Sequence, residues 1–247
     1  MRIGIISDIH ANLAALEVVL DKLDELGAAD RLWCLGDVVG YGPYPNECLE
    51  LLRTYEHVCL PGNHDWGAIG RADPELFNNE ARFVLEWTAA HLSADNRAYL
   101  EALPEIVEMP DVPFTLVHAS PRDPIWEYLL EPQEAAECFP LVNTPYCLVG
   151  HPHVPTIFRA AVGEYSVKMI MPEPDEIIRL AGARLIVNPG SVGQPRDQDP
   201  RAHYAFYDSE EGTLHLGRIG YPIEVTQAAM RDLNFPRRLI SRLDYGF

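Results

Sequence analysis

The sequence predicts an α/β fold with a largely parallel sheet covered by helices. Short apolar segments typical of buried strands alternate with amphipathic segments typical of helices, and polar residues directly follow several of the apolar segments. The chain has 247 residues, 47% hydrophobic and 23% charged, so it can bury a sizeable core. Because the sequence shows no internal repeat and no linker, we expect a single domain over residues 1–247.

The first quarter of the chain supplies the clearest alternation. Residues 2–6 form an apolar run that predicts a buried strand, and Asn12 is a suitable N-cap for the helix after it. Leucines recur at helical spacing over residues 13–23, and Gly27 is expected to end this helix. The pattern continues with strands at residues 31–35 and 57–60 and a helix at residues 46–53. This order of elements implies parallel strands with covering helices.

The middle of the chain predicts a helical insert at residues 77–103, broken into two helices near Ser93. We expect Phe83 and Trp87 to pack in the core, and the insert to overhang the functional site and favour small substrates. The other expected elements are strands at 105–109, 114–117 and 146–149, a helix at 133–139, short strands over 156–218 and a helix at 224–234.

The composition excludes several classes of function. The 37 acidic and 19 basic residues give a formal net charge of −18, which disfavours a nucleic-acid polymer as partner. Bound cations could reverse this field locally and admit a small phosphorylated substrate. The five cysteines form no CxxC pair and are expected to be reduced and buried. No apolar run is long enough to span a membrane, and a polar motif at residue 8 leaves no room for a leader, so we predict a cytoplasmic protein.

Polar side chains follow five of the predicted strands. They are Asp8 and His10 after the first strand, Asp37 after the second, Asn63 and His64 after the third, His118 after residues 114–117, and His151 and His153 after residues 146–149. Because ligands gather at the carboxyl ends of strands in such sheets, we expect these residues to converge on one place.

The chemistry of these side chains indicates metal binding. Two aspartates, one asparagine and four histidines offer oxygen and imidazole ligands without a thiolate, a set that suits Mn, Fe, Zn, Ni or Co better than Mg or Ca. Seven ligands are too many for one tetrahedral zinc ion. Their number fits two divalent transition-metal ions that share a carboxylate, and we take manganese as the favoured metal.

At this point the sequence resembles the calcineurin-like metallophosphoesterases, whose five motifs it matches in order. The matching segments are Ser7-Asp8-Ile9-His10, Gly36-Asp37-Val38-Val39-Gly40, Gly62-Asn63-His64-Asp65, Val117-His118-Ala119 and Gly150-His151-Pro152-His153. Residues 188–193 are also similar to a segment of the small prokaryotic phosphodiesterase branch. The resemblance implies a four-layer α/β/β/α sandwich with the metals at the strand ends.

The resemblance also implies a role for each motif residue. The first metal would be bound by Asp8, His10 and His153, the second by Asn63, His118 and His151, and both by Asp37. A water bridging the metals would attack phosphorus, because two cations lower its pKa. His64 would act as general acid on the leaving oxygen. Asp65 would orient His64, although a carboxylate there could equally cap a turn.

Several residues near the motifs keep two interpretations. Arg122 could grip phosphate oxygens or pair with Asp123 or Glu127, and we expect either equally. We expect Tyr41, Ser191 and Arg196 to stabilise turns, with contact to the substrate as the alternative. Packing or surface positions are expected for the four histidines outside the motifs, namely His57, His91, His203 and His215.

We therefore expect a two-metal enzyme that hydrolyses a small phosphodiester. The alternatives are a phosphomonoesterase or protein phosphatase, a dinucleoside polyphosphate hydrolase, and a metal-binding scaffold of the same fold without activity. The scaffold is disfavoured because all seven ligands and His64 are present. Apolar residues near the C-terminus are expected to fold onto the domain, although they could instead form a homo-oligomer: Ile223, Val225, Leu239 and Ile240.

Overall fold

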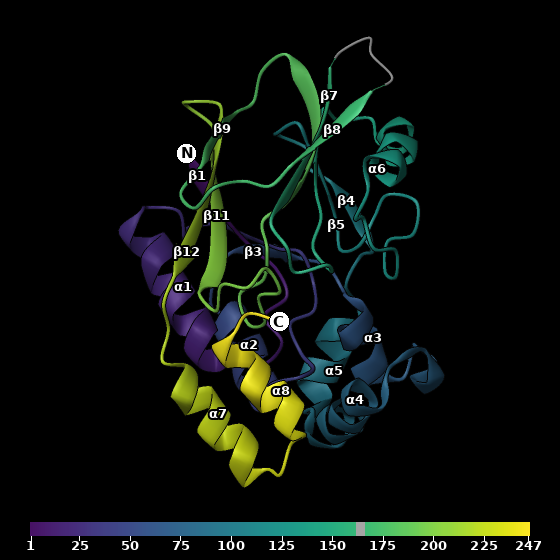
Figure 1. Ribbon diagram of the computed structural model, residues 1–247, viewed down its shortest axis with the longest axis vertical. Coiled ribbons are helices and arrows are strands. Elements are labelled where there is room, and N and C mark those ends of the chain that lie inside the picture. The colour runs from purple at the N-terminus through teal and green to yellow at the C-terminus, as the bar shows by residue number, and fades with distance from the viewer. Residues whose placement is uncertain (162–165) are drawn as a thin grey trace.

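Two six-stranded sheets pack face to face with helices on their outer faces (Figure 1). The computed structural model describes residues 1–161 and 166–247; residues 162–165, inside the predicted strand-rich segment, lie outside the described residues. The first sheet has the order β3 (His57–Cys59), β2 (Leu32–Cys34), β1 (Arg2–Ile6), β11 (Ala202–Asp208), β12 (Thr213–Ile219) and β9 (Ile177–Arg179). The second has the order β4 (Ile106–Glu108), β5 (Phe114–Val117), β6 (Tyr146–Leu148), β10 (Ala183–Asn188), β7 (Thr156–Ala161) and β8 (Val167–Ile170). The predicted four-layer α/β/β/α sandwich is confirmed.

The expected largely parallel sheet is found in only half of each sheet. Strands β1, β2 and β3 pair in parallel, as do β5, β6 and β10, whereas all other described pairs are antiparallel. The later strands follow one another through short connections that hold no crossover helix, as between β11 and β12, and such connections favour antiparallel pairing. The parallel strands are the ones that carry the polar motifs at their carboxyl ends.

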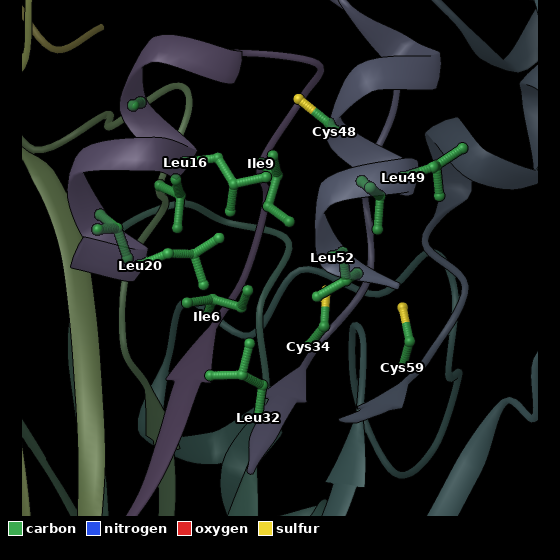
Figure 2. Packing of buried hydrophobic residues seen from close by; sticks show 14 of the residues in the cluster. Ile6, Ile9, Leu16, Leu20, Leu32, Cys34, Cys48, Leu49, Leu52 and Cys59 are labelled. Atoms are coloured by element: carbon green, nitrogen blue, oxygen red, sulfur yellow. The ribbon is translucent and has the colours of Figure 1, made fainter. Parts of the chain in front are cut away.

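Alternation along the strands separates an inner core from an outer one. Trp33 faces the second sheet, where its ring centroid lies 5.3 Å from that of Phe114, whereas its neighbour Leu32 faces the helices. Helices α1 (Leu13–Glu25) and α2 (Pro45–Leu52) cover that outer face of the first sheet (Figure 2). The five cysteines are free and buried, as predicted, and three of them lie in this outer core.

Local capping explains where the predicted helices begin and end. The Asn12 side chain accepts a hydrogen bond from the backbone N–H of Ala15 at 3.3 Å, and Gly27 ends the α1 segment with a φ of 63°. The insert forms α4 (Asn79–His91) and α5 (Ala94–Glu101), and Ser93 caps the second of them. The two-helix prediction is thus confirmed. Helix α6 (Pro132–Cys138) covers the second sheet, and α7 (Ile223–Asp232) is the expected late helix.

Two short helices were not predicted from the sequence. Helix α3 (Asn63–Ile69) begins within a polar motif, and α8 (Arg237–Ser241) leads into a 3₁₀ turn, η3 (Arg242–Asp244). The C-terminal segment folds back, since Leu239 and Ile240 pack with Ala81 and Val84 of α4. No helix among the described residues is long and apolar enough to cross a membrane.

Candidate metal centre

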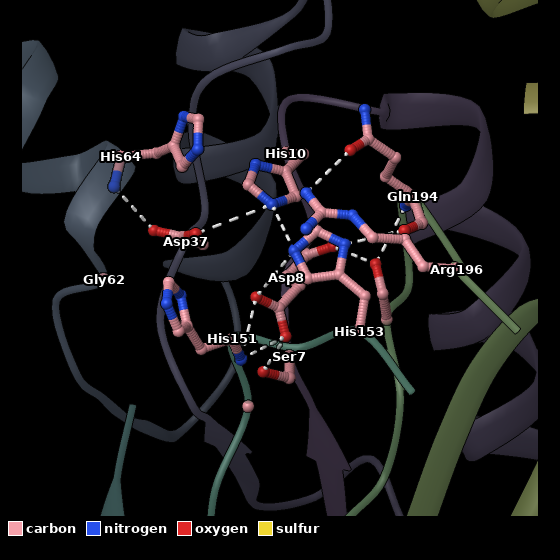
Figure 3. Close-up of polar contacts among 12 residues, drawn as sticks. Ser7, Asp8, His10, Asp37, Gly62, His64, His151, His153, Gln194 and Arg196 are labelled. Carbon is pink, nitrogen blue, oxygen red and sulfur yellow. Dashed lines mark hydrogen bonds and ion pairs between the residues drawn. The ribbon is translucent and has the colours of Figure 1, made fainter. Parts of the chain in front are cut away.

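The carboxyl ends of the parallel strands converge on one polar cluster (Figure 3). Five residues of this cluster have a left-handed backbone, with φ of 54° at Asp8, 49° at His10, 53° at Asp37, 71° at His151 and 61° at His153. This conformation costs about 1–2 kcal/mol for each non-glycine residue, so the fold must hold these residues in it. The sharp turns direct side chains from separate strands towards a common point.

Backbone hydrogen bonds between neighbouring loops hold this conformation. Asp8 N–H donates to the carbonyl of Gly36 at 3.0 Å, and His10 N–H donates to the carbonyl of Asp37 at 2.9 Å. Gly62 leaves room for the cluster, because a Cβ at this position would overlap the Asp37 carboxylate. The glycine of this motif is therefore needed for a close approach of the backbone to a ligand side chain.

The side chains fall into two groups of candidate ligands that share Asp37. One group is Asp8, His10, Asp37 and His153, and the other is Asp37, His118 and His151. Within each group the ligand atoms lie within 4.8 Å of one another, and all six residues are buried. Asp37 Oδ2 is 3.5 Å from His10 Nε2 and 3.6 Å from His118 Nε2, one histidine from each group. Asn63 is buried beside Asp37, whose Oδ1 accepts the next backbone N–H along the chain.

Hydrogen bonds to backbone carbonyls fix the tautomers of three of these histidines. The contacts join Nδ1 of His10 to Val39 O at 3.2 Å, Nδ1 of His118 to Leu35 O at 2.7 Å and Nδ1 of His153 to Gln194 O at 2.7 Å. A carbonyl only accepts, so each Nδ1 carries the proton and each neutral ring presents a lone pair at Nε2. This is the arrangement in which histidine binds a metal.

The lone pairs face one another without a donor between them. His10 Nε2 and His153 Nε2 lie 3.0 Å apart, which is about the separation of two ligands bound at right angles to one cation at about 2.1 Å. Four further buried atoms have no hydrogen-bond partner among the described residues: Asp37 Oδ2, Asn63 Oδ1, His118 Nε2 and His151 Nε2. Buried acceptors are rarely left unsatisfied, so this donor-poor cluster fits divalent cations.

The pKa values of these residues in the cation-free site also fit a cation-binding role. Burial raises the pKa of Asp8 to about 7 and the pKa of Asp37 well above its ordinary value. Burial also lowers the pKa values of His10, His151 and His153 well below their ordinary value. Burial thus favours the neutral form of each group. A cation that enters the site would favour ionisation of the two carboxylates.

His64 lies at the edge of the cluster, at the start of α3. Its backbone N–H donates to Asp37 Oδ1 at 2.8 Å, which fixes the helix start against the shared carboxylate. The ring centroid lies 4.3 Å from that of Tyr41, 4.9 Å from that of His10 and 5.3 Å from that of Phe77. The ring is therefore positioned by aromatic packing, and its buried Nδ1 has no partner in the described part of the chain.

The expectation that Asp65 orients His64 is wrong. The Asp65 carboxylate accepts backbone N–H groups from Gly62 at 2.9 Å, Val39 at 3.0 Å and Val38 at 3.3 Å. These bonds cap α3 and tie it to the loop after β2, so the capping alternative describes this residue. Asp65 therefore supports the backbone of the site without touching the His64 ring nitrogens.

The residues with two interpretations are placed as follows. Arg122 forms ion pairs with Glu127 and Glu137, so the pairing alternative holds for it. Ser191 serves its turn, because its hydroxyl donates to the carbonyl of Asp8 at 2.8 Å and accepts the N–H of Gln194 at 2.9 Å.

The turn interpretation also fits the segment after Asp37. Gly42 N–H donates to the carbonyl of His10 at 3.0 Å, and the Tyr41 ring packs 4.7 Å from the His10 ring. The histidines outside the motifs contact protein groups and lie outside the ligand groups: His57, His91, His203 and His215.

The insert reaches the site through one residue. Phe77 contacts the His64 ring. The Phe77 ring also packs against Trp126, with their ring centroids 5.4 Å apart. Trp87 is partly buried against Phe235, as expected, whereas Phe83 contacts the same ring but is 45% exposed, so the expectation that Phe83 packs in the core is wrong. The helices themselves therefore do not supply the contact with His64, and the overhang is limited to the segment before α4.

Sequence reasoning missed several residues that border the site. Tyr128 lies with its ring centroid 4.1 Å from that of His151, and Trp126 and Phe77 form an aromatic wall beside His64. These residues belong to none of the motifs, and aromatic side chains outside a periodic pattern give no signal of a site in a single sequence.

Comparisons with known proteins agree with this geometry. Residues 1–212 match the family model described as the calcineurin-like phosphoesterase superfamily domain. This chain belongs to the calcineurin-like phosphoesterase superfamily. Proteins of this superfamily are hydrolases that bind divalent metal ions, and the Asp/His groups around Asp37 are the residues here that could bind them.

Three proteins illustrate what this chain is similar to. The crystal structure of a metallophosphoesterase from Sphaerobacter thermophilus has a TM-score of 0.87 and 46% identity over 100% of this chain and 99% of that chain. An uncharacterised protein of Methanocaldococcus jannaschii is 34% identical over 99% of this chain and 98% of its own length. A symmetrical bis(5'-nucleosyl)-tetraphosphatase of Pseudomonas putida is 32% identical over 43% of this chain, which spans only 31% of that protein.

Proposed function

We propose that this metallophosphoesterase hydrolyses a small phosphodiester with two divalent transition-metal ions, manganese being favoured. The observation that carries the proposal is the set of buried acceptor atoms around Asp37 Oδ2, which itself has no hydrogen-bond donor among the described residues. Two cations bound there would activate water and stabilise the attacking and leaving oxygens of an in-line displacement at phosphorus. The five buried, free cysteines support a reducing, cytoplasmic location.

The proposed ligand sets follow the two groups of side chains. Asp8, His10 and His153 would hold one cation, and Asn63, His118 and His151 the other. Asp37 would bind both, because one of its oxygens lies between a histidine of each group. Burial holds His10 and His153 neutral by lowering their pKa values, and the Nδ1 hydrogen bonds to backbone carbonyls fix the direction of the three imidazoles and raise their basicity as ligands.

His64 is proposed as the residue that donates to the leaving oxygen. Burial and the positive charge of Arg196 lower its pKa well below the ordinary value, which favours a neutral ring before substrate binds. A neutral imidazole still carries one N–H that can hydrogen-bond an oxygen as charge develops on it, and an incoming phosphate anion raises the histidine pKa again. Its ring is held close to the ligand His10 by Tyr41, which supports this position.

The surroundings of the site favour small substrates over polymers. Phe77 packs against His64 and Trp126 packs against Phe77, and the net charge of −18 repels a nucleic-acid backbone. A second candidate substrate class is a dinucleoside polyphosphate, because the Pseudomonas putida tetraphosphatase is similar over part of the chain. A protein phosphatase has no such support among the described contacts.

Metal add-back tests the proposal. Metal-stripped protein is assayed with bis-p-nitrophenyl phosphate and p-nitrophenyl phosphate after addition of Mn, Ni, Co, Fe, Zn or Mg. We expect diester cleavage only with added metal, lost in Asp37→Asn and retained in His91→Ala, a change at an exposed histidine of the insert. Cleavage of the monoester alone would replace the proposal with a phosphomonoesterase, and no turnover with any metal would contradict it for these substrates.

A further inference from the structure

Two arginines from distant parts of the chain meet over one aromatic ring beside the metal centre. The Cζ atoms of Arg196 and Arg242 lie 5.8 Å and 5.9 Å from the centroid of the Tyr41 ring. Arg196 belongs to the loop after β10 and Arg242 to η3 near the C-terminus. A backbone hydrogen bond of 2.9 Å from Gln198 N–H to Gly246 O holds these two segments together. The fold therefore brings both guanidinium groups to the Tyr41 ring, near enough for the charge of Arg196 to act on the pKa of Arg242.

Neither arginine is neutralised by a carboxylate side chain of the described chain. Arg196 Nη2 donates to Gln194 Oε1 at 3.1 Å, while its buried Nε has no partner among the described residues. Arg242 Nε donates to a main-chain oxygen of Phe247, the last residue of the sequence, and no described side chain bonds its two Nη atoms. Several N–H donors of the two forks are thus left for an external acceptor.

Other arginines of this acidic chain do have carboxylate partners. Arg218, which also reaches the loop after β10, forms a 2.6 Å ion pair with Asp197, and Arg122 pairs with two glutamates. Around Arg242, burial and the nearby charge of Arg196 lower its pKa to about 10. The two cations thus repel each other in a partly buried place, and an anion bound between them would relieve that repulsion.

The arginines lie close enough to the metal residues to act on the same substrate. The Tyr41 ring beneath them packs directly on the rings of His10 and His64. The charge of Arg196 acts on the pKa of His10 and of His153, and Figure 3 shows its side chain beside these histidines. A phosphate attacked at the metal centre would therefore have the arginines next to it, on the Tyr41 side.

We infer that Arg196 and Arg242 form an anion subsite that binds a second phosphate of the substrate, one that is not attacked. Paired guanidinium forks match phosphate oxygens in geometry and charge. The inference rests on the proposed function and narrows its substrate class to small molecules with two or more linked phosphates.

The test is the affinity of metal-loaded protein for two non-hydrolysable probes, measured by titration calorimetry. Methylphosphonate carries one phosphonate group and methylenediphosphonate carries two. We compare the affinity for the diphosphonate divided by the affinity for the monophosphonate. In Arg196→Gln and in Arg242→Gln, this ratio should fall about tenfold, because one charge-assisted bidentate contact with the second phosphonate group is removed. Arg242→Lys keeps the positive charge but not the forked guanidinium. Its affinity ratio should lie between the ratios of the wild type and of Arg242→Gln.

The matched control is Arg238→Gln, which removes the same charge from a side chain that is 84% exposed one turn before Arg242. The Arg238→Gln and Arg242→Gln proteins hold the same metals, so contacts between the diphosphonate and the metals contribute equally to the affinities of both variants. An unchanged affinity ratio in Arg242→Gln, or an equal loss for both probes, would overturn the subsite.

Turnover of bis-p-nitrophenyl phosphate, measured on the same preparations, keeps the two proposals apart. Its absence in the wild type would contradict the proposed function, whereas the affinity ratio tests the subsite without any turnover. Thermal unfolding of each variant excludes a folding defect as the cause of a changed ratio.

Discussion

Two buried polar clusters lie side by side in this protein and differ in how their charges are met. In one, the Asp197 carboxylate faces a permanent cation of the chain, Arg218, whose Nη1 lies at 2.6 Å, and His203 Nε2 lies at 3.4 Å. Burial acts to raise the Asp197 pKa, but these partners outweigh it and lower the pKa below the ordinary value. In the other, around Asp37, the carboxylates and imidazoles face one another as acceptors, and burial raises the carboxyl pKa.

The difference indicates what each cluster is for. A buried carboxylate with an arginine beside it is met within the chain, and the loss of either partner destabilises the fold. Buried carboxylates and imidazoles that face one another with no cation among them are suited to a bound metal ion. The two clusters are joined through Ser191, whose N–H donates to His203 Nδ1 at 3.0 Å and whose hydroxyl donates to the carbonyl of Asp8 at 2.8 Å. The cluster around Asp197 therefore supports the loop that carries Asp8, a residue of the cluster around Asp37.

The largest effect is expected from Asp37→Asn. The change removes the carboxylate shared by both ligand groups, so we expect a loss of roughly 10³-fold in kcat together with weaker metal binding. Folding of the metal-free protein should be preserved, because the variant no longer buries an unpaired carboxyl group. Steady-state kinetics, metal analysis and thermal unfolding check the three parts. Full activity with normal metal content would contradict the assignment of Asp37.

The matched change in the other cluster, Asp197→Asn, should have the opposite profile. It leaves His203 without its carboxylate and Arg218 with only Asp199, at 3.3 Å, so we expect a loss of about 3 kcal/mol in the free energy of unfolding. The variant should still bind the same number of metal ions. Urea unfolding and metal analysis measure both quantities. If Asp197→Asn lost metals while keeping its stability, the contrast between the clusters would be false.

His64→Ala should lower kcat by about 10²-fold while leaving metal binding intact, because His64 is proposed to act on the leaving oxygen and not as a ligand. The loss should be greater for esters of poor leaving groups, such as alkyl phosphodiesters, than for p-nitrophenyl esters. A plot of kcat against the leaving-group pKa tests this. The same loss for every leaving group would indicate a role in positioning alone.

The pH dependence of metal binding gives a smaller effect. The pKa of Asp8 is about 7 in the cation-free protein, so below pH 7 an entering cation must displace a proton, and above it the carboxylate is already ionised. Because of Asp8, the affinity for Mn²⁺ should therefore fall by a further factor of about ten for each pH unit below 7, and binding there should release the Asp8 proton in addition to that of Asp37, whose pKa is also raised. The ligand histidines with lowered pKa values stay neutral in this range. Calorimetry in buffers of different ionisation enthalpy at pH 6 and pH 8 counts the protons, and equal counts would contradict the prediction.

The sequence allowed the ligand positions and most elements of the fold to be predicted, because both depend on local order. Asp8 and His10 directly follow an apolar run, and Asn12 caps the next helix, so the strand, the turn and the helix are visible within a few residues. The residues after each parallel strand then had to meet at one edge of the sheets.

The parts that were missed depend on tertiary contacts. Helix α3 begins inside a motif with glycines on both sides, and it is held by the Asp65 cap and the bond from His64 N–H to Asp37. Arg242 reaches the site only because the C-terminal segment docks on the loop that carries Arg196. Neither contact leaves a periodic signal in the sequence, and the antiparallel half of each sheet was missed because short strands do not reveal their pairing.

The central claim is that the buried acceptors around Asp37 hold two adjacent cations. Titration of metal-stripped protein with Mn²⁺, followed by electron paramagnetic resonance, tests it most directly. We predict two ions per chain and the spectrum of a spin-coupled pair, because Asp37 would bridge ions about 3.5–4 Å apart. The coupled spectrum should be absent in Asp37→Asn and present in Asp197→Asn. One ion per chain, or two ions with the spectrum of isolated Mn²⁺, would contradict the account.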